Sequence, residues 1–147
     1  MKTILASIDF SSASQPVVAE AVKLARSMRA RLVLLHVVQP PIVVTSELGS
    51  QMSADYSVAA EASATKQLIS FKKSMQAKGV TVVTRQVLGN PGQCIVAEAA
   101  ELKAEFIVLG SHGHGAFYEL IIGSTTSRVL KQARCPVVVV PQKKAGK

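Results

Sequence analysis

The chain has 147 residues, a length that suits one domain with a sizeable core, and 48% of them are hydrophobic. Its net charge of +8 favours anionic partners, but aromatic residues make up only 4%, which argues against a stacking platform for single-stranded nucleic acid. The basic residues are scattered apart from a short tail over residues 143–147. No apolar run approaches the length of a membrane span, and the first residues do not resemble a secretion signal. We therefore expect a globular, cytoplasmic protein that binds neither membranes nor nucleic acid.

Strands and helices are predicted to alternate from the first residues onward. Residues 3–9 form the first strand, and a polar stretch beginning with Asp9 offers caps for the helix that follows, whose apolar residues recur at helical spacing up to Met28. Residues 31–38 are almost continuously apolar, as in a strand buried on both faces of a sheet. Two prolines then end that strand.

The middle of the chain is predicted to be a loop followed by a helix. Residues 42–55 are polar and contain glycine, which indicates a loop. Residues 56–77 then form a helix that Gly79 terminates. The apolar side chains expected to face the core from this helix are Leu68, Ile69, Phe71 and Met75.

The rest of the chain continues the alternation. Its expected elements are a strand at 80–87, a helix at 93–103, a strand at 106–110, a helix at 124–132 and a strand at 137–140. Strands that alternate with helices imply right-handed crossovers and a mostly parallel sheet covered by helices on both faces. Because no linker and no internal repeat interrupts the pattern, we expect a single α/β domain over residues 1–147.

A glycine motif follows the strand at 106–110. Gly110, Gly113 and Gly123 are followed by Ser124 in a Gly-x2-Gly-x9-Gly-Ser pattern, between a strand and a helix. Glycines let the backbone approach a bulky anion closely, and the start of a helix offers N–H groups and hydroxyls to phosphate oxygens. The motif therefore predicts a phosphate cradle. The alternative is a long loop whose glycines merely supply turns.

The position of the motif in the sheet strengthens this prediction. In open α/β sheets, ligands bind beyond the carboxyl ends of the strands where the strand order reverses. If the order is 3-2-1-4-5, Asp9 and Gly110 would line one crevice. Asp9 could then accept hydrogen bonds from a ribose hydroxyl or an exocyclic amine, or it could cap the first helix. The backbone of Val37 could pair with an adenine edge, although Val37 also suits an ordinary strand position.

The histidines and cysteines give weaker signals. His36 is best read as a buried residue at a strand end, whereas His112 and His114 lie within the glycine loop, where one of them could reach phosphate or ribose. Cys94 and Cys135 form no CxxC pair and no metal-ligand spacing, so we interpret both as small core residues rather than reactive thiols.

The sequence resembles the universal stress protein family over nearly its whole length. The resemblance rests on the opening Ile-Leu-Ala-Ser-Ile-Asp-Phe-Ser at 4–11, on Leu-Leu-His-Val at 34–37 and on the closing Cys-Pro-Val-Val-Val-Val at 135–140. The glycine motif itself is the mark of the ATP-binding branch of that family. The resemblance implies a five-stranded parallel sheet of order 3-2-1-4-5, Rossmann-like and similar to adenine nucleotide alpha hydrolases, and a homodimer.

The same resemblance implies a ligand, which is ATP or its relatives ADP and AMP, with a divalent cation such as Mg²⁺ or Mn²⁺ on the phosphates. The residues that it assigns to the nucleotide are Ser7, Ile8, Asp9, Val37, Leu109, Gly110, His112, Gly113, Gly123, Ser124, Thr125 and Thr126. It implies no catalytic residue and no metal ligand from the chain. Two positions depart from the family pattern: His114 stands where Arg or Lys is frequent, and Arg29 stands where a glycine often ends the first helix.

The leading functional hypothesis is a nucleotide-binding stress-response protein that is regulated by occupancy and dimerisation. No P-loop, nucleophile elbow or kinase signature accompanies the glycine motif. A slow Mg-dependent ATPase or nucleotidyl-transfer enzyme and a nucleotide-independent dimeric interaction module remain as alternatives. The expected dimer contact is the apolar edge strand, which consists of Val137, Val138, Val139 and Val140. Alternatively, the Lys-rich tail shields that edge.

Overall fold

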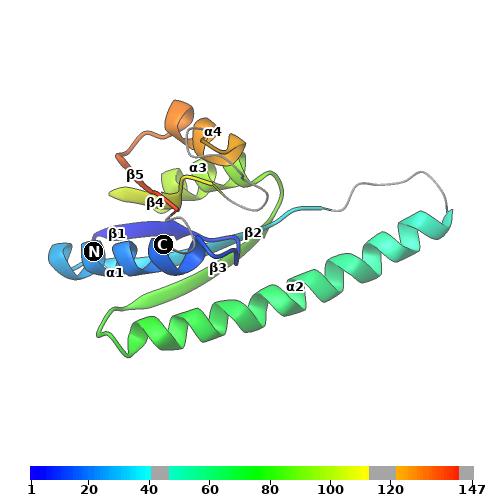
Figure 1. Ribbon diagram of the computed structural model, residues 1–147, viewed down its shortest axis with the longest axis horizontal. Helices are drawn as coiled ribbons and strands as arrows, with labels where there is room; N and C mark the ends of the chain where they lie inside the picture. The colour runs from blue at the N-terminus through cyan, green and yellow to red at the C-terminus, as the bar shows by residue number, and fades with distance from the viewer. Residues whose placement is uncertain (41–46, 113–121, 143–147) are drawn as a thin grey trace, which may run out of the picture.

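The computed structural model describes residues 1–40, 47–112 and 122–142, with the backbone alone over 47–56. Strands and helices alternate along these residues as the sequence predicts (Figure 1). In chain order they are β1 (Thr3–Ser7), α1 (Ser14–Met28), β2 (Arg31–Val38), α2 (Glu47–Gln76), β3 (Val82–Leu88), α3 (Pro91–Glu101), β4 (Phe106–Gly110), α4 (Ser124–Gln132) and β5 (Val137–Val140).

The sheet has the predicted topology. Its five strands run in the order β3-β2-β1-β4-β5, and all neighbouring strands are parallel. The apolar runs of β1, β2 and β4 occupy the three central positions, where both faces of a strand are covered. The expectation of an open, doubly covered α/β sheet of order 3-2-1-4-5 is therefore confirmed.

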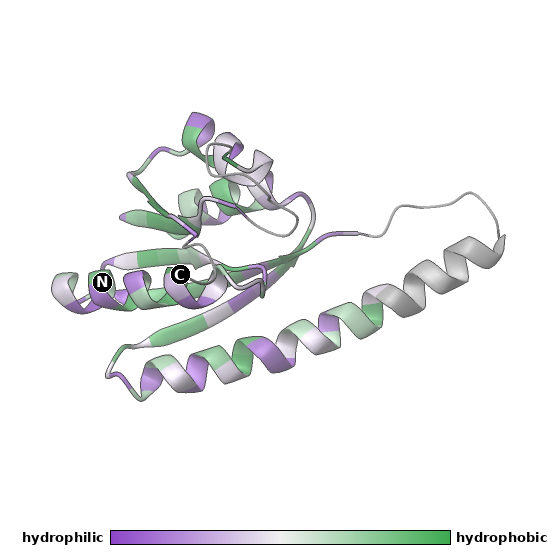
Figure 2. Ribbon diagram, viewed as in Figure 1, coloured by the Kyte–Doolittle hydropathy of each residue, from purple (hydrophilic) through white to green (hydrophobic). Residues whose placement is uncertain are grey.

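The core lies in two layers, one on each face of the sheet. Alternate residues of each strand point to opposite faces, so Ile4 packs with α1 and α2 while Leu5 packs with α3 and α4. Ile4, Leu5 and Leu35 are all fully buried. Figure 2 shows this concentration of hydrophobic residues in the strands, in contrast to the mixed surface of α2.

Two expectations about the second helix are wrong. The helix begins at Glu47 instead of Tyr56, so the part of the predicted loop over 47–55 is helical; residues 42–46 lie outside the described residues. Ser and Gly suggested a loop, but their propensities are a weak signal beside Leu, Gln, Met and Ala, which favour helix. Ile69 is 45% exposed, because α2 buries only one narrow stripe against the edge of the sheet. The other three predicted residues follow that stripe: Leu68 and Met75 are buried and Phe71 packs against the core.

The ends of α1 differ in how well they were anticipated. The polar stretch from Asp9 does not cap the helix, since Ala13 occupies the N-cap position without a side-chain hydrogen bond. At the other end, Arg29 adopts the left-handed conformation (φ 52°) that usually favours glycine, and its backbone N–H bonds back to the last turn. The departure at Arg29 therefore changes the residue at this turn without changing the turn itself.

Candidate functional site

The candidate site is the carboxyl edge of the sheet between β1 and β4. The chain leaves β1 for β2 on one side and later enters β4 on the other, so β1 and β4 are adjacent strands at the point where the order reverses. Loops that leave such a pair in opposite directions form a crevice in which open α/β sheets bind ligands. The segments after Ser7 and after Gly110 meet at this edge.

Asp9 closes the turn between β1 and α1. Its Oδ1 accepts hydrogen bonds from the backbone N–H of Ser11 at 2.9 Å and from the hydroxyl of Ser14 at 3.4 Å. Asp9 therefore stabilises the turn that precedes α1 and does not occupy the N-cap position of the helix. These bonds fix the orientation of the carboxylate just after the end of β1.

The residue after Asp9 carries backbone strain. Phe10 has φ 63°, a left-handed conformation that is unfavourable for a bulky side chain. The centre of its ring lies 4.3 Å from the ring centre of His36 and 6.2 Å from that of Phe71 in α2. Packing against these rings holds the turn in a conformation that the backbone alone would leave.

His36 ties the end of β2 to the end of β1. Its Nδ1 lies 2.9 Å from the carbonyl oxygen of Ile8, and because a carbonyl only accepts, Nδ1 is the protonated nitrogen. Burial lowers the pKa of His36, although the bond to Ile8 and the nearby charge of Asp9 oppose that effect. His36 is therefore a half-buried strand-end residue, as predicted.

The backbone of Val37 points toward the crevice. The carbonyl of Leu35 accepts from Ile8 N on the β1 side, and that of Val38 accepts from Gly89 N on the β3 side, both at 2.9 Å. Backbone groups of successive residues in a parallel strand serve alternate neighbours. The N–H and C=O of Val37 accordingly face the β1 side, past the end of β1, while its side chain is buried. An adenine edge could pair there.

Gly110 ends β4 in a tight position. A Cβ at this residue would lie 3.2 Å from the carbonyl oxygen of His112 and 3.4 Å from the Cβ of Ala13. The carbonyl of Gly110 accepts a 2.7 Å bond from the hydroxyl of Thr126, whose side chain is buried. The Thr126 hydroxyl thus anchors α4 to β4, and Leu109 before it is buried in the core. Thr126 and Leu109 are both buried, so they support the end of β4 from within the core.

The amino end of α4 lies at the same edge of the sheet and has features that suit an anion. Gly123 occupies the N-cap position without a side-chain cap, and its own N–H donates to the carbonyl of Ser111 at 2.9 Å. The first N–H groups of a helix have no partner within it, and the helix dipole places partial positive charge there. Ser124 is exposed and Thr125 is half-buried, so both residues are accessible at this helix start. Gly113 and His114 lie outside the described residues.

Ser111 and His112 form a polar pair at the mouth of the crevice. The Ser111 hydroxyl lies 2.9 Å from Nδ1 of His112. The other ring nitrogen, Nε2, is buried and has no hydrogen-bond partner among the described residues. A buried ring nitrogen without a partner is costly, so this atom suits a polar group that a ligand would bring.

Gln142 and Ser12 are contacts of the site that sequence reasoning missed. The register of β4 with β5 pairs Gly110 with Val140, which carries the chain after β5 back over the same edge. There Gln142 Nε2 donates to the hydroxyl of Ser12 at 3.0 Å, and its backbone N lies 3.4 Å from the hydroxyl of Ser111. No motif signals such a contact, because it depends on strand register across 130 positions.

The described residues contain no group of three or more His, Cys, Asp or Glu side chains placed to hold a metal ion.

The two cysteines are half-buried beside the core layer that α3 and α4 cover, and burial raises the pKa of Cys135. A raised pKa keeps a thiol protonated and unreactive. Among the described residues, none of the helices is long and apolar enough to cross a membrane.

An open parallel sheet with a helix amino end and an ordered acidic residue at its carboxyl edge defines a doubly wound α/β protein with a ligand crevice at the switch point. The sequence pattern of the Universal stress protein family matches residues 1–141, and the chain belongs to that family. It is 31% identical over 143 residues to Universal stress protein YxiE of Bacillus subtilis, covering 93% of this chain and 97% of the relative.

Solved structures show the same fold. Universal stress protein UspA from Lactobacillus plantarum gives a TM-score of 0.86 at 27% identity, covering 95% of this chain and 97% of that one. A universal stress protein in complex with cAMP gives 0.72 at 22% identity, with 95% and 96% covered. One from Archaeoglobus fulgidus in complex with dAMP gives 0.66 at 20% identity, with 95% and 98% covered.

Proposed function

We propose that this chain binds an adenine nucleotide (ATP, ADP or AMP) between the carboxyl ends of β1 and β4, and that occupancy regulates a stress response. The observation that carries the proposal is the juxtaposition of Asp9 and the uncapped start of α4 across one crevice. A carboxylate suits ribose hydroxyls, whereas helix N–H groups suit phosphates. Two solved structures of this fold are complexes with cAMP and with dAMP, which supports an adenine nucleotide as the ligand.

Each part of the ligand has chemically matched residues. The backbone of Val37 would pair with the adenine edge, Ser7, Ile8 and Asp9 would border the ribose, and Ser124 and Thr125 would hold the phosphates. His112 would meet a phosphate or ribose oxygen with its Nε2, which has no hydrogen-bond partner among the described residues. Gly110, Gly113, Gly123, Leu109 and Thr126 would keep the backbone of the cradle in place. A bound divalent cation would neutralise phosphate charge and would be held by the phosphates, since no ligand cluster of the protein offers itself among the described residues.

We further propose that β5 pairs with a second copy of the chain. β5 is an edge strand of four valines, and Val139 belongs to neither core layer although its neighbours Val137 and Val138 do. An apolar edge with unpaired backbone groups favours antiparallel pairing about a two-fold axis. We expect Val139→Asp to convert a dimer into a monomer in sedimentation experiments. A wild-type monomer at all concentrations would overturn this part.

The central test is the identity and affinity of the ligand. Mass spectrometry of the ligand released from gently purified protein should detect an adenine nucleotide, and calorimetry should show binding of ATP, ADP or AMP in preference to GTP. Asp9→Ala should weaken binding at least tenfold, about 1.4 kcal/mol. The matched control is Glu20→Ala, which removes an exposed carboxylate of α1 that forms an ion pair with Lys23 on the surface.

The outcomes separate the alternatives. Release of ADP from ATP and Mg²⁺ that disappears in Asp9→Ala would identify an enzyme. Absence of nucleotide in the extract together with no heat at millimolar ATP, ADP and AMP would contradict the proposal and favour a nucleotide-independent module. Denaturant unfolding of each variant distinguishes loss of binding from loss of folding.

A further inference from the structure

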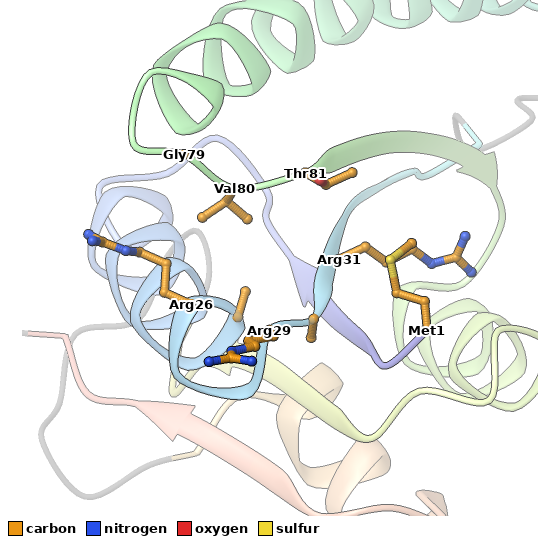
Figure 3. Close-up of a pocket in the computed structure, with 9 residues that line it drawn as sticks. Met1, Arg26, Arg29, Arg31, Gly79, Val80 and Thr81 are labelled. Carbon is orange, nitrogen blue, oxygen red and sulfur yellow. The ribbon is translucent and has the colours of Figure 1, made fainter.

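A second pocket lies at the opposite, amino edge of the sheet. It has a volume of about 370 Å³ and is bounded by the end of α1, the start of β2 and the segment that leads from α2 to β3 (Figure 3). The residues that line it are Met1, Ala25, Arg26, Arg29, Ala30, Arg31, Gly79, Val80 and Thr81. Nothing in the proposed nucleotide crevice uses these residues, so the pocket needs its own explanation.

Three arginines line this pocket. Arg26 of α1 and Arg29, which follows α1, lie on one side of the hollow, and Arg31 of β2 lies on the other side, beside Met1; their guanidinium groups point outward in different directions (Figure 3). Among the described residues, none of the three forms an ion pair; Arg31 donates from Nε to the hydroxyl of Thr3 at 2.9 Å. Guanidinium groups carry fixed charge and match the oxygens of phosphate in a bidentate way.

The arginines are not needed to finish the helices that end here. At the end of α1, the carbonyl of Ala25 accepts from Ala30 N at 2.9 Å and that of Arg26 accepts from Arg29 N at 3.2 Å. At the end of α2, Gly79 N and Lys78 N likewise bond back to helix carbonyls. Backbone groups satisfy these carbonyls at the helix ends, so the arginine side chains are not required there. Arg26 and Arg29 are also exposed, which leaves their side chains able to turn toward a ligand.

The floor of the pocket is apolar. Ala25, Ala30 and Val80 are all buried with less than a tenth of their surface exposed. A volume of about 370 Å³ lies at the small end of ligand pockets, which suits one small molecule and not a polymer. Three positive charges without an ion-pair partner in the described part of the chain favour a dianion over a single carboxylate.

We propose that the amino-edge pocket binds a small organic phosphate, with the exposed side chains of Arg26 and Arg29 turned inward onto its phosphate and its apolar body against Val80. The site is separate from the nucleotide crevice and lies at the other end of the same strands. A small phosphate could therefore occupy it whether or not a nucleotide is bound. The same chemistry would also recognise the phosphate headgroup of a lipid.

The test uses phenyl phosphate as the probe and the full chain labelled for NMR. Titration should shift the amide signals of Ala30, Val80 and Thr81, and phenol, which lacks the phosphate, should not. The double variant R26Q/R29Q should weaken binding about tenfold. The control K66Q/K131Q removes the same charge from exposed positions on α2 and α4 and should change affinity by less than about twofold.

The outcomes decide both the site and the source of the phosphate. Shifts confined to Gly110 and Thr126, no shifts at all, or equal weakening in both double variants would overturn the proposal. Sedimentation with phosphatidic acid vesicles but not with phosphatidylcholine vesicles, lost in R26Q/R29Q, would support the site with a lipid as the source. Binding of phenyl phosphate without vesicle binding would support it with a free small molecule as the source.

Discussion

The two edges of the sheet, each of which we propose to bind an anion, hold their polar groups in different ways. At the carboxyl edge, hydrogen bonds join the polar groups of separate elements to one another, as Thr126 to Gly110 and Gln142 to Ser12 show. At the amino edge, backbone bonds complete the helix ends, and Arg26 and Arg29 remain exposed and without ion pairs among the described residues. The polar groups of the first edge are therefore held in place by hydrogen bonds, whereas the arginines of the second edge are exposed and without ion pairs among the described residues.

This difference makes separable demands on the chain. Binding at a preorganised edge depends on backbone position, so small steric changes there should matter more than charge. Binding by exposed guanidinium groups depends on the net field, so salt should matter more than shape. The same fold can thus hold two anion sites that respond to different perturbations.

The largest effect is expected from adding one methyl group at each edge. Gly110→Ala forces a Cβ to within 3.2 Å of His112 O and should weaken nucleotide binding at least tenfold. Gly79→Ala, in the turn after α2, meets nothing within 4 Å but strains a residue at φ 77°, which costs about 1 kcal/mol. Calorimetry and urea unfolding should therefore show an affinity loss for Gly110→Ala alone. Equal nucleotide affinities in the two variants would abolish the contrast.

A smaller effect is expected when a buried hydroxyl is removed from the carboxyl edge. Thr126→Val keeps the shape of the side chain but leaves the carbonyl of Gly110 without its 2.7 Å bond, at a cost of about 1–2 kcal/mol in the free energy of unfolding. Thr65→Val is the matched control, because that hydroxyl also donates to a backbone carbonyl, at 2.9 Å, but is exposed. Its loss should cost less than about 0.5 kcal/mol. Similar costs in the two variants would show that Thr126 does not anchor α4.

The sequence predicts the frame of this contrast well. β2, β4 and β5 occupy the predicted residues, because long apolar runs identify buried parallel strands without reference to distant contacts. The alternation of elements then places Asp9 and Gly110 at one edge of the sheet. These inferences need only local pattern and topology.

The polar contacts of both edges were beyond such reasoning. The bond between Gln142 and Ser12 depends on the register of β5, and Arg26, Arg29 and Arg31 look scattered in sequence although a helix end and a strand start bring them to one pocket. The start of α2 was missed because the Ser and Gly residues over 47–55 suggested a loop, although Leu48 and Met52 are spaced four residues apart, as in a helix. Long-range register and surface charge therefore mark the limit of local pattern.

Salt should separate the two edges further, by a smaller factor. We expect phenyl phosphate to bind the amino edge about fivefold more weakly when sodium chloride rises from about 50 to 200 mM, because exposed charges are screened over this range. AMP, held at the carboxyl edge largely by backbone N–H groups, should lose no more than about twofold. Calorimetry or NMR titration at the two salt concentrations measures both. A greater loss for AMP than for phenyl phosphate would reverse the assignment of mobile charge.

The smallest effect concerns pH at the carboxyl edge. Burial lowers the pKa of His36 from its usual 6.5, so the folded state favours the neutral ring. As pH falls through about 6.5, the unfolded chain takes up a proton on His36 before the folded chain does. The contribution of neutral His36 to the free energy of unfolding is therefore fully present above about pH 6.5 and is lost as pH falls below that value. Because His36 is only half-buried, solvent screens the effect, and we expect the free energy of unfolding to change by less than about 1 kcal/mol.

The variant His36→Asn keeps a hydrogen-bond donor for the carbonyl of Ile8 but does not titrate. Urea unfolding at about pH 7.5 and 5.5 should therefore show a steeper loss of stability in the wild type than in the variant. Parallel losses would mean that other groups account for the pH dependence of this edge.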